Sequence, residues 1–178
     1  REGVSDGSAT VRDMSEITHR QVEANGLSVH IAEQGEGPLV LLCHGFPESW
    51  YSWRHQLPAL AAAGYHAVAM DMRGYGSTTQ PKEIASYTIS HLIGDVVGTV
   101  AALGEQSAVV VGHDWGAPVA WWSALMRPDL FRAVACMSVP YLPPIGALPE
   151  GTTMNDLMRL MANGLDYYRL YFQEPGVA

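Results

Sequence analysis

The stretch VVVGHDWGAPVA (Val109–Ala120) decides the fold of this 178-residue chain. The run of valines is typical of a buried β-strand, and the apolar pattern that follows Gly116 has the spacing of a helix. The chain must turn sharply between them, and the glycines at 112 and 116 have the small size that a strained turn requires. We therefore predict a strand, a tight turn and a helix, with the Asp114 side chain held clear at the end of the strand.

Asp114 stands where hydrolases with a G-x-S-x-G turn carry their nucleophilic serine. A serine hydroxyl is a weak nucleophile until a neighbouring base takes its proton, whereas a carboxylate is already ionised at neutral pH. A carboxylate suits attack on a saturated carbon with a strained or good leaving group, and it forms an alkyl ester that water must then cleave. The alternative is that Asp114 is an ordinary N-cap of a helix over Trp115–Met126, because aspartate is a favoured cap residue.

A second segment favours the hydrolase interpretation. Leu39–Cys43 is a continuous apolar run, as in buried parallel strands, and it leads into His44-Gly45-Phe46-Pro47. In hydrolases of this architecture the oxyanion hole combines the N–H after the nucleophile with one from the loop after the third strand. We therefore predict the backbone N–H groups of Phe46 and Trp115 as oxyanion donors, with both aromatic side chains lining a dry substrate pocket. Packing of both rings in the core is the alternative.

Four motifs in the chain are distinctive: HGFPESWYSWRHQ (44–56), DMRGYGSTTQP (71–81), GHDWGAPVAW (112–121) and YYRLYFQEPGVA (167–178). Together they resemble the epoxide hydrolases of the α/β-hydrolase fold, and the resemblance runs from about Ile17 to the last residue. It implies that Asp114 opens an epoxide, that Phe46 and Trp115 supply the oxyanion donors, and that Tyr168 of a helical cap donates to the epoxide oxygen. Tyr167 and Tyr171 are less favoured for that role. The implied partners are a small-molecule epoxide and water, and the implied process is detoxification.

The resemblance also implies a second cap tyrosine, an acid, and a histidine base that drives hydrolysis of the ester. In this fold the chain order is nucleophile, acid and then histidine. All the histidines of this chain precede Asp114, namely His19, His30, His44, His55, His66, His91 and His113. We therefore expect the base, the acid and the second tyrosine to lie outside these 178 residues, and the chain to be a truncated one that stops inside the cap.

Apolar runs and helical patterns alternate along the chain, which predicts an α/β fold with a mostly parallel sheet and helices on both faces. Strands are expected at 27–34 (an edge strand), 39–43, 66–70, 108–111 and 133–139, and helices at 49–63, 89–103, 115–126, 154–165 and 167–173. Prolines and glycines after Pro140 indicate a linker. The predicted domains are a flexible extension (1–16), the N-terminal part of the hydrolase core (17–139), and a linker with the beginning of the cap (140–178).

The composition, with 48% hydrophobic and 16% charged residues, is typical of a globular catalytic domain. A net charge of −8 argues against a nucleic-acid partner, and no apolar stretch is long enough to span a membrane. Cys43 and Cys136 lie in apolar strand patterns and are predicted to be buried thiols, which favours a cytoplasmic location. We expect no cofactor and no metal, because Gly74-Tyr75-Gly76 lacks the third glycine of a dinucleotide loop and His113 has no second ligand at metal spacing. A homodimer is compatible with the sequence.

Two other functions stay open at this point. A haloalkane or haloacid dehalogenase of the same fold would share the aspartate nucleophile and can share Trp115. Haloalkane dehalogenases usually carry Asn where Phe46 stands, and fluoroacetate dehalogenases usually follow the nucleophile with Arg, so both differences disfavour that class. The other alternative is a non-catalytic hydrolase-fold binding protein. Asp71 is interpreted as a structural turn residue and His44 as a brace for its loop.

Overall fold

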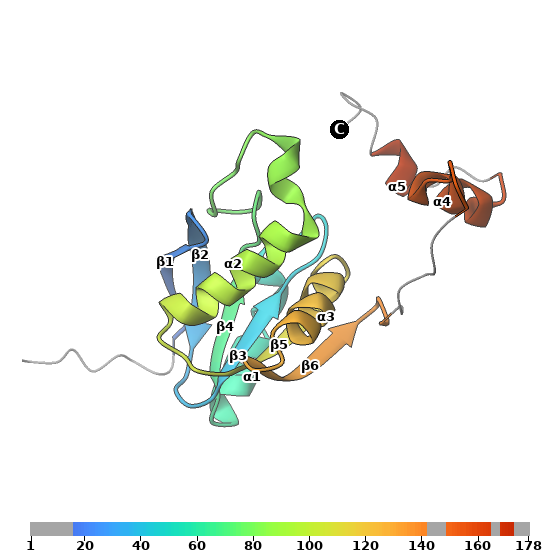
Figure 1. Ribbon diagram of the computed structural model, residues 1–178. Helices are drawn as coiled ribbons and strands as arrows, with labels where there is room; N and C mark the ends of the chain where they lie inside the picture. The colour runs from blue at the N-terminus through green and yellow to red at the C-terminus, as the bar shows by residue number, and fades with distance from the viewer. Residues whose placement is uncertain (1–15, 142–148, 165–167, 173–178) are drawn as a thin grey trace, which may run out of the picture. The chain divides into compact units, whose positions relative to one another are not determined.

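The computed structural model describes residues 16–141, 149–164 and 168–172 (Figure 1). It divides into two compact units, one ending at Tyr141 and the other beginning at Leu142. The first unit contains a six-stranded sheet in the order β1-β2-β4-β3-β5-β6. Its strands are β1 (Thr18–Ala24), β2 (Leu27–Gln34), β3 (Leu39–Cys43), β4 (His66–Met70), β5 (Ala108–His113) and β6 (Phe131–Met137).

The sheet is parallel from β4 to β6 and antiparallel at its β1 end. β3 pairs in parallel with β4 and β5, and β5 pairs in parallel with β6. β1 pairs antiparallel with β2, and β2 with β4. The mostly parallel sheet is confirmed, but the prediction of β2 as an edge strand is wrong because β1 lies outside it. β1 has a weak sequence signal, since only Val22 and Ala24 of its seven residues are buried.

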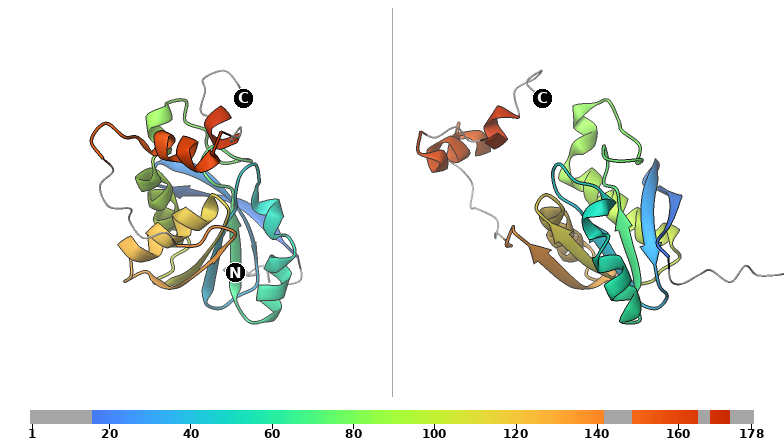
Figure 2. Two further views of the ribbon diagram at one scale, coloured as in Figure 1. Left: turned by 90° about the vertical axis from the view of Figure 1, so that its right-hand side faces the viewer. Right: turned by 180° about the vertical axis from the view of Figure 1, so that it is seen from behind.

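Helices cover both faces of the sheet (Figure 2). α2 (Ile89–Ala102) and α3 (Gly116–Met126) pack on one face, where the side chains of Leu39 and Leu41 join the larger apolar cluster. The 3-10 helix η1 (Trp50–Trp53) and α1 (Gln56–Ala62) cover the other face, where Val40 and Leu42 meet Trp53 and Leu57. β3 is therefore apolar at every position because both of its faces are buried.

The predicted single helix at 49–63 is two separate helices in the structure, η1 and α1. Pro58 explains the break, because a proline removes a backbone donor and is tolerated in the first turn of a helix but not in its interior. A new helix therefore starts at Gln56, just before the proline. Another 3-10 helix, η2 (Ile84–Tyr87), precedes α2 and was not predicted.

Glu33 of β2 is a buried carboxylate between Arg20 and His66. Its oxygens accept from Arg20 Nε at 2.6 Å and lie 2.9 Å from His66 Nε2. Burial opposes its ionisation, but the hydrogen bonds from His66 and Arg20 outweigh that effect and lower the pKa of Glu33 from 4.5 to about 2. This cluster joins β1, β2 and β4 at one end of the sheet.

Glu33 should therefore make the stability of the chain depend on pH at the acid end. A carboxylate whose pKa is lower in the folded state stabilises that state above its unfolded pKa, and this contribution is lost as the pH falls. We expect the free energy of unfolding to decline from pH 4.5 down to about 2 in the wild type, with a smaller slope in Glu33→Gln. Urea titrations across this range measure the slope, and Glu23→Gln on the exposed side of β1 is the control. Equal slopes in the wild type and Glu33→Gln would contradict the assignment.

The second unit contains α4 (Met154–Ala162) and α5 (Tyr168–Tyr171). Thr153 and Asp156 form a capping box, in which the Asp156 N–H donates to Thr153 Oγ1 at 3.2 Å and the Thr153 N–H donates to Asp156 Oδ2 at 2.8 Å. α4 ends earlier than predicted because Asn163 is in the left-handed conformation, with φ 49°. Residues 142–148 of the predicted linker lie outside the described residues.

Candidate active site

Asp114 lies at the carboxyl end of β5, in the turn that leads into α3. Its backbone is in the left-handed region with φ 49°, which aspartate tolerates better than most residues. The two flanking glycines are required by packing: a Cβ at Gly112 would collide with the Gly116 carbonyl, and one at Gly116 would collide with the Cys43 carbonyl. The predicted sharp turn between strand and helix is thereby confirmed.

The side chain of Asp114 contacts the loop after β3, residues His44–Trp50, which we call the β3 loop. The backbone N–H of Phe46 donates to Asp114 Oδ1 at 2.9 Å. Gly45 lies directly against the same carboxylate, because a Cβ at position 45 would be 2.8 Å from Asp114 Oδ1. The loop and the turn, which are 68 residues apart in the sequence, thus meet at one carboxylate oxygen.

The N-cap interpretation of Asp114 is wrong. The N-cap residue of α3 is Trp115, and Asp114 Oδ1 accepts the N–H of Phe46 from the loop after β3. The N–H of Ala117 donates to the backbone carbonyl of Asp114 at 3.0 Å, so the turn is closed by main-chain atoms. The Asp114 side chain is therefore directed toward the β3 loop.

Phe46 and Trp115 both present large exposed rings. Phe46 is 40% and Trp115 48% exposed, so neither belongs to the core, and the alternative of core packing is wrong. Tyr75, which the sequence did not single out, is half-buried and packs edge-on against His44 with ring centroids 5.1 Å apart. Burial and then the negative charge of Asp114 raise the pKa of Tyr75, which keeps this phenol protonated near the carboxylate. The surroundings of Asp114 are thus largely aromatic.

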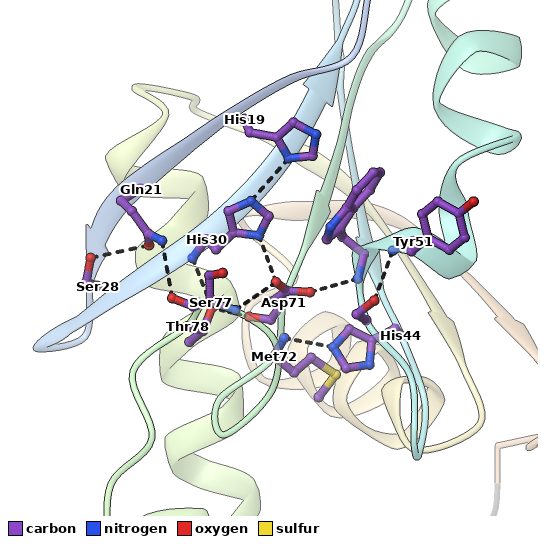
Figure 3. A network of polar contacts seen from close by, with 12 residues as sticks. His19, Gln21, Ser28, His30, His44, Tyr51, Asp71, Met72, Ser77 and Thr78 are labelled. Atoms are coloured by element: carbon purple, nitrogen blue, oxygen red, sulfur yellow. Dashed lines mark hydrogen bonds and ion pairs between the residues drawn. The ribbon is translucent and has the colours of Figure 1, made fainter.

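His44 braces the loop, as predicted. It is fully buried, and its Nε2 accepts the backbone N–H of Met72 at 3.0 Å (Figure 3). Because that nitrogen accepts, Nδ1 carries the hydrogen and donates to the Gly45 carbonyl at 2.8 Å. Burial lowers the pKa of His44, in agreement with a neutral ring. The ring therefore has a structural role and no free nitrogen for chemistry.

Glu48 and His113 form a second link between the β3 loop and the turn, which sequence reasoning missed. Glu48 Oε2 accepts the N–H of Gly45 at 3.0 Å, and His113 Nδ1 lies 3.2 Å from Glu48 Oε1. Burial disfavours ionisation of Glu48, but the bonds from Gly45 and His113 outweigh it and lower its pKa. A cavity of about 360 Å³ opens beside this pair, lined by Glu48, Ser52, Trp53, Arg54, Gln56, His113 and Met137. His113 thus has a carboxylate partner.

Tyr168 is the first residue of α5 in the second unit, and it is 56% exposed. Its ring packs edge-on against Phe172, with centroids 6.4 Å apart. Tyr171 lies in the same helix, and Tyr167 lies outside the described residues. The role of the Tyr168 hydroxyl as a donor remains a prediction.

The thiols of Cys43 and Cys136 are unbridged, as predicted, although Cys136 is only half-buried. Burial raises the pKa of Cys43 to about 12 and that of Cys136 to about 11, so both are poor nucleophiles. In the described part of the chain, no group of three or more His, Cys, Asp or Glu residues is arranged to hold a metal ion. Nor does that part include a helix with the length and apolar character needed to cross a bilayer.

The sequence profile of the alpha/beta hydrolase fold family matches residues 38–175, which include β3, the β3 loop, the turn at Asp114 and α5. The chain belongs to the alpha/beta hydrolase fold family. Within that family it is 47% identical over 167 residues to epoxide hydrolase 3 of Siraitia grosvenorii, covering 93% of this chain and 51% of that protein. It is also 47% identical to epoxide hydrolase A of Mycobacterium tuberculosis, covering 93% of this chain and 50% of the relative.

Solved structures of this fold agree closely with the chain. The crystal structure of an epoxide hydrolase from Vigna radiata matches with a TM-score of 0.83 and 52% identity, covering 92% of this hydrolase-fold chain and 51% of the other. An epoxide hydrolase from an endophytic Streptomyces matches with a TM-score of 0.81 and 51% identity, over 90% and 47% of the two chains. The chain thus spans about half the length of the relatives that it matches.

Proposed function

We propose that this chain is part of an enzyme that hydrolyses epoxides to vicinal diols through an ester on Asp114. The observation that carries the proposal is the carboxylate in the left-handed turn after β5, with the Phe46 N–H on its Oδ1 at 2.9 Å. A serine at this position would need a base before it could attack, whereas a carboxylate attacks a strained ring directly. The similarity to epoxide hydrolases from plants and bacteria supports the same reaction.

In the first half of the proposed reaction, Asp114 Oδ2 attacks a ring carbon because Oδ1 is held by Phe46. The carbon–oxygen bond of the ring breaks, and the Tyr168 hydroxyl donates a hydrogen bond or its proton to the developing alkoxide. The rings of Phe46 and Trp115 form an apolar wall for the substrate. The product of this half is an alkyl ester of Asp114.

In the second half, water adds to the carboxyl carbon of the ester, and the negative charge develops on Oδ1. The N–H groups of Phe46 and Trp115 stabilise that charge, which is the role of an oxyanion hole. Collapse of this intermediate breaks the bond between the carboxyl carbon and the ester oxygen. That oxygen takes up the proton that the base removed from water, so the diol leaves and one water oxygen stays in Asp114. The proposal places the base that activates water, the acid that supports it and a second cap tyrosine outside these 178 residues. The two unbridged thiols fit a cytoplasmic location.

Substrate choice tests the proposal against a dehalogenase. Both classes use an aspartate nucleophile, but an epoxide oxygen needs a proton donor and a halide does not. We expect the intact protein to convert styrene oxide to its diol and to leave 1-bromobutane and fluoroacetate unchanged. Gas chromatography measures both possible products, the diol from the epoxide and the dehalogenated product from the halogenated substrates. Release of halide without turnover of any epoxide would replace the proposal with dehalogenation, and no turnover of either class would favour a binding protein.

Replacing Tyr168 with phenylalanine tests the proposed donor. The variant keeps the ring that packs on Phe172 and removes only the hydroxyl. We expect the rate of ester formation to fall by roughly ten- to a thousandfold, the usual range for loss of one such acid or donor. Rapid-quench single-turnover kinetics measure this step. Tyr171→Phe in the same helix, equally exposed at 56%, is the matched control and should keep the wild-type rate. A larger loss in Tyr171→Phe would move the donor role to that residue.

A further inference from the structure

A polar network ties the β3 loop (His44–Trp50) to the segment that follows β4 (Figure 3). At one end of the loop, His44 Nε2 accepts the N–H of Met72 at 3.0 Å. At the other end, the Trp50 N–H donates to Asp71 Oδ1 at 2.8 Å. Phe46 lies between these two attachments, so the position of its N–H depends on two consecutive residues, Asp71 and Met72.

Asp71 is a carboxylate in a site built to hold it. It is 1% exposed, and besides Trp50 it accepts the N–H of Ser77 at 3.2 Å and a ring nitrogen of His30 at 2.7 Å, both on Oδ2. Gly76 has no room for a Cβ, which would collide with the same carboxylate. A buried carboxylate is costly unless such donors surround it. The prediction of Asp71 as a structural turn residue is confirmed, but its hydrogen-bond partners also include His30 in β2 and Trp50 in the β3 loop.

His30 supplies the side-chain donor to Asp71 from β2. Because the carboxylate is an acceptor, His30 Nδ1 must carry a hydrogen. The backbones are joined as well: the Asp71 N–H donates to the His30 carbonyl at 2.9 Å, and the His30 N–H donates to Thr78 Oγ1 at 2.9 Å. Thr78 in turn donates to the Asp71 carbonyl at 2.7 Å. These bonds connect β2 to Asp71, which holds the Trp50 end of the β3 loop.

The other nitrogen of His30 faces a second histidine. His30 Nε2 lies 3.2 Å from His19 Nδ1 of β1, and the two rings are stacked with centroids 5.3 Å apart and 8° between their planes. A hydrogen bond there requires a hydrogen on one nitrogen and none on the other. Two neutral rings in this arrangement can accept one extra proton but not two. If both rings were fully protonated, both of the facing nitrogens would carry a hydrogen and the hydrogen bond between them would be lost.

We propose that Asp71 and His30 are positioning residues for the Phe46 N–H, and that His19 sets the proton arrangement of His30 and so couples the β3 loop to pH. This role rests on the proposed function only in so far as the Phe46 N–H acts in catalysis. Outside the pair, the titratable side chain that the described residues place beside it is Asp71, which contacts His30 and whose charge acts on His19. Trp50, which packs edge-on against His19 at 4.5 Å, carries no charge. Burial and the neighbouring His30 lower the pKa of His19.

The test follows the Phe46 amide by ¹H–¹⁵N NMR in the intact protein, from about pH 7.5 to about pH 5. We expect the wild-type resonance to move as the extra proton enters the pair of His19 and His30. His19→Phe, which keeps a stacked ring on an exposed edge position, should remove that movement. His30→Phe should displace the resonance across the whole range and lower kcat by about tenfold with little change in KM, since mispositioning a donor acts on the chemical step. His91→Phe, at an exposed position of α2, is the control.

A Phe46 resonance that responds to pH equally in the wild type and in His19→Phe would overturn the proposal, even if His30→Phe failed to fold. So would an unchanged Phe46 resonance in a folded His30→Phe variant. The expected NMR changes in a protein that turns over no epoxide would keep the positioning role and reject the proposed function. Epoxide turnover without these NMR changes would keep the proposed function and reject the positioning role.

Discussion

Asp114→Asn is expected to lower the rate of epoxide opening by about 10⁴-fold or more, the scale seen when a catalytic nucleophile is removed. Asparagine has the same shape, and its amide oxygen can still accept the Phe46 N–H that Asp114 Oδ1 accepts at 2.9 Å. The amide lacks the charge and the second free oxygen that attack the ring carbon. The loss should therefore appear in ester formation and not in folding, and single-turnover kinetics with a radiolabelled epoxide measure it.

Asp129→Asn is the matched control for this substitution. Asp129 is exposed and paired with Arg127 at 2.7 Å, so the same chemical change there should leave turnover unaltered. The mass of the Asp114→Asn protein must be checked at the end of the assay, because hydrolysis of the amide would regenerate aspartate. Turnover within tenfold of the wild type, from protein that still carries asparagine, would remove Asp114 from the role of nucleophile.

Asp95→Ala is expected to destabilise the chain by about 3–5 kcal/mol, the usual cost of breaking a buried ion pair by removing one partner. Asp95 of α2 and Arg73 have side chains only 2% and 4% exposed. Arg73 donates to Asp95 through Nε at 2.8 Å and through Nη2 at 2.6 Å, and Asn25 Nδ2 donates to the same carboxylate at 2.9 Å. Removing the carboxylate deprives the buried guanidinium of its charged acceptor and leaves it the Ser86 carbonyl, to which Arg73 Nη1 donates at 2.8 Å.

Urea unfolding followed by circular dichroism measures this loss as a fall in the midpoint at constant slope. Asp129→Ala removes the acid of an exposed Arg–Asp pair and should leave the midpoint unchanged, because solvent screens such pairs. The double variant Asp95→Ala/Arg73→Met should recover part of the loss, since it also removes the unpaired cation. Equal effects of Asp95→Ala and Asp129→Ala would show that burial does not govern the strength of this pair.

Local patterns predicted the parts of the fold whose residues are uniformly apolar or sterically special. β3 could be predicted from the sequence because both of its faces are buried, so all of its residues are apolar. The turn at Asp114 could be predicted because it is flanked by Gly112 and Gly116, where packing leaves no room for a side chain. β1 was missed because the residues around its two buried positions are mostly polar. The break between η1 and α1 was missed, although Pro58 carried the signal for it.

The residues around Asp114 could be predicted only where they belong to a recognisable sequence motif. The contact between the Phe46 N–H and Asp114 followed from the order of strand and loop. Glu48 and His113 lie 65 residues apart, and His30 and Asp71 lie 41 apart, so no local pattern in a single sequence indicates that they meet. Their pairing arises from strand order in the sheet, which tertiary packing decides.

Single turnover in ¹⁸O-water tests the covalent route through Asp114 most directly. The intact enzyme, in excess over styrene oxide, is quenched after one turnover, digested and analysed by mass spectrometry of the peptide that contains Asp114. Because water adds to the carboxyl carbon of the ester, the account predicts one ¹⁸O atom in Asp114 and an unlabelled diol, with no label in enzyme incubated without substrate. Label in the diol and none in Asp114 would contradict it, since water would then have attacked the epoxide itself.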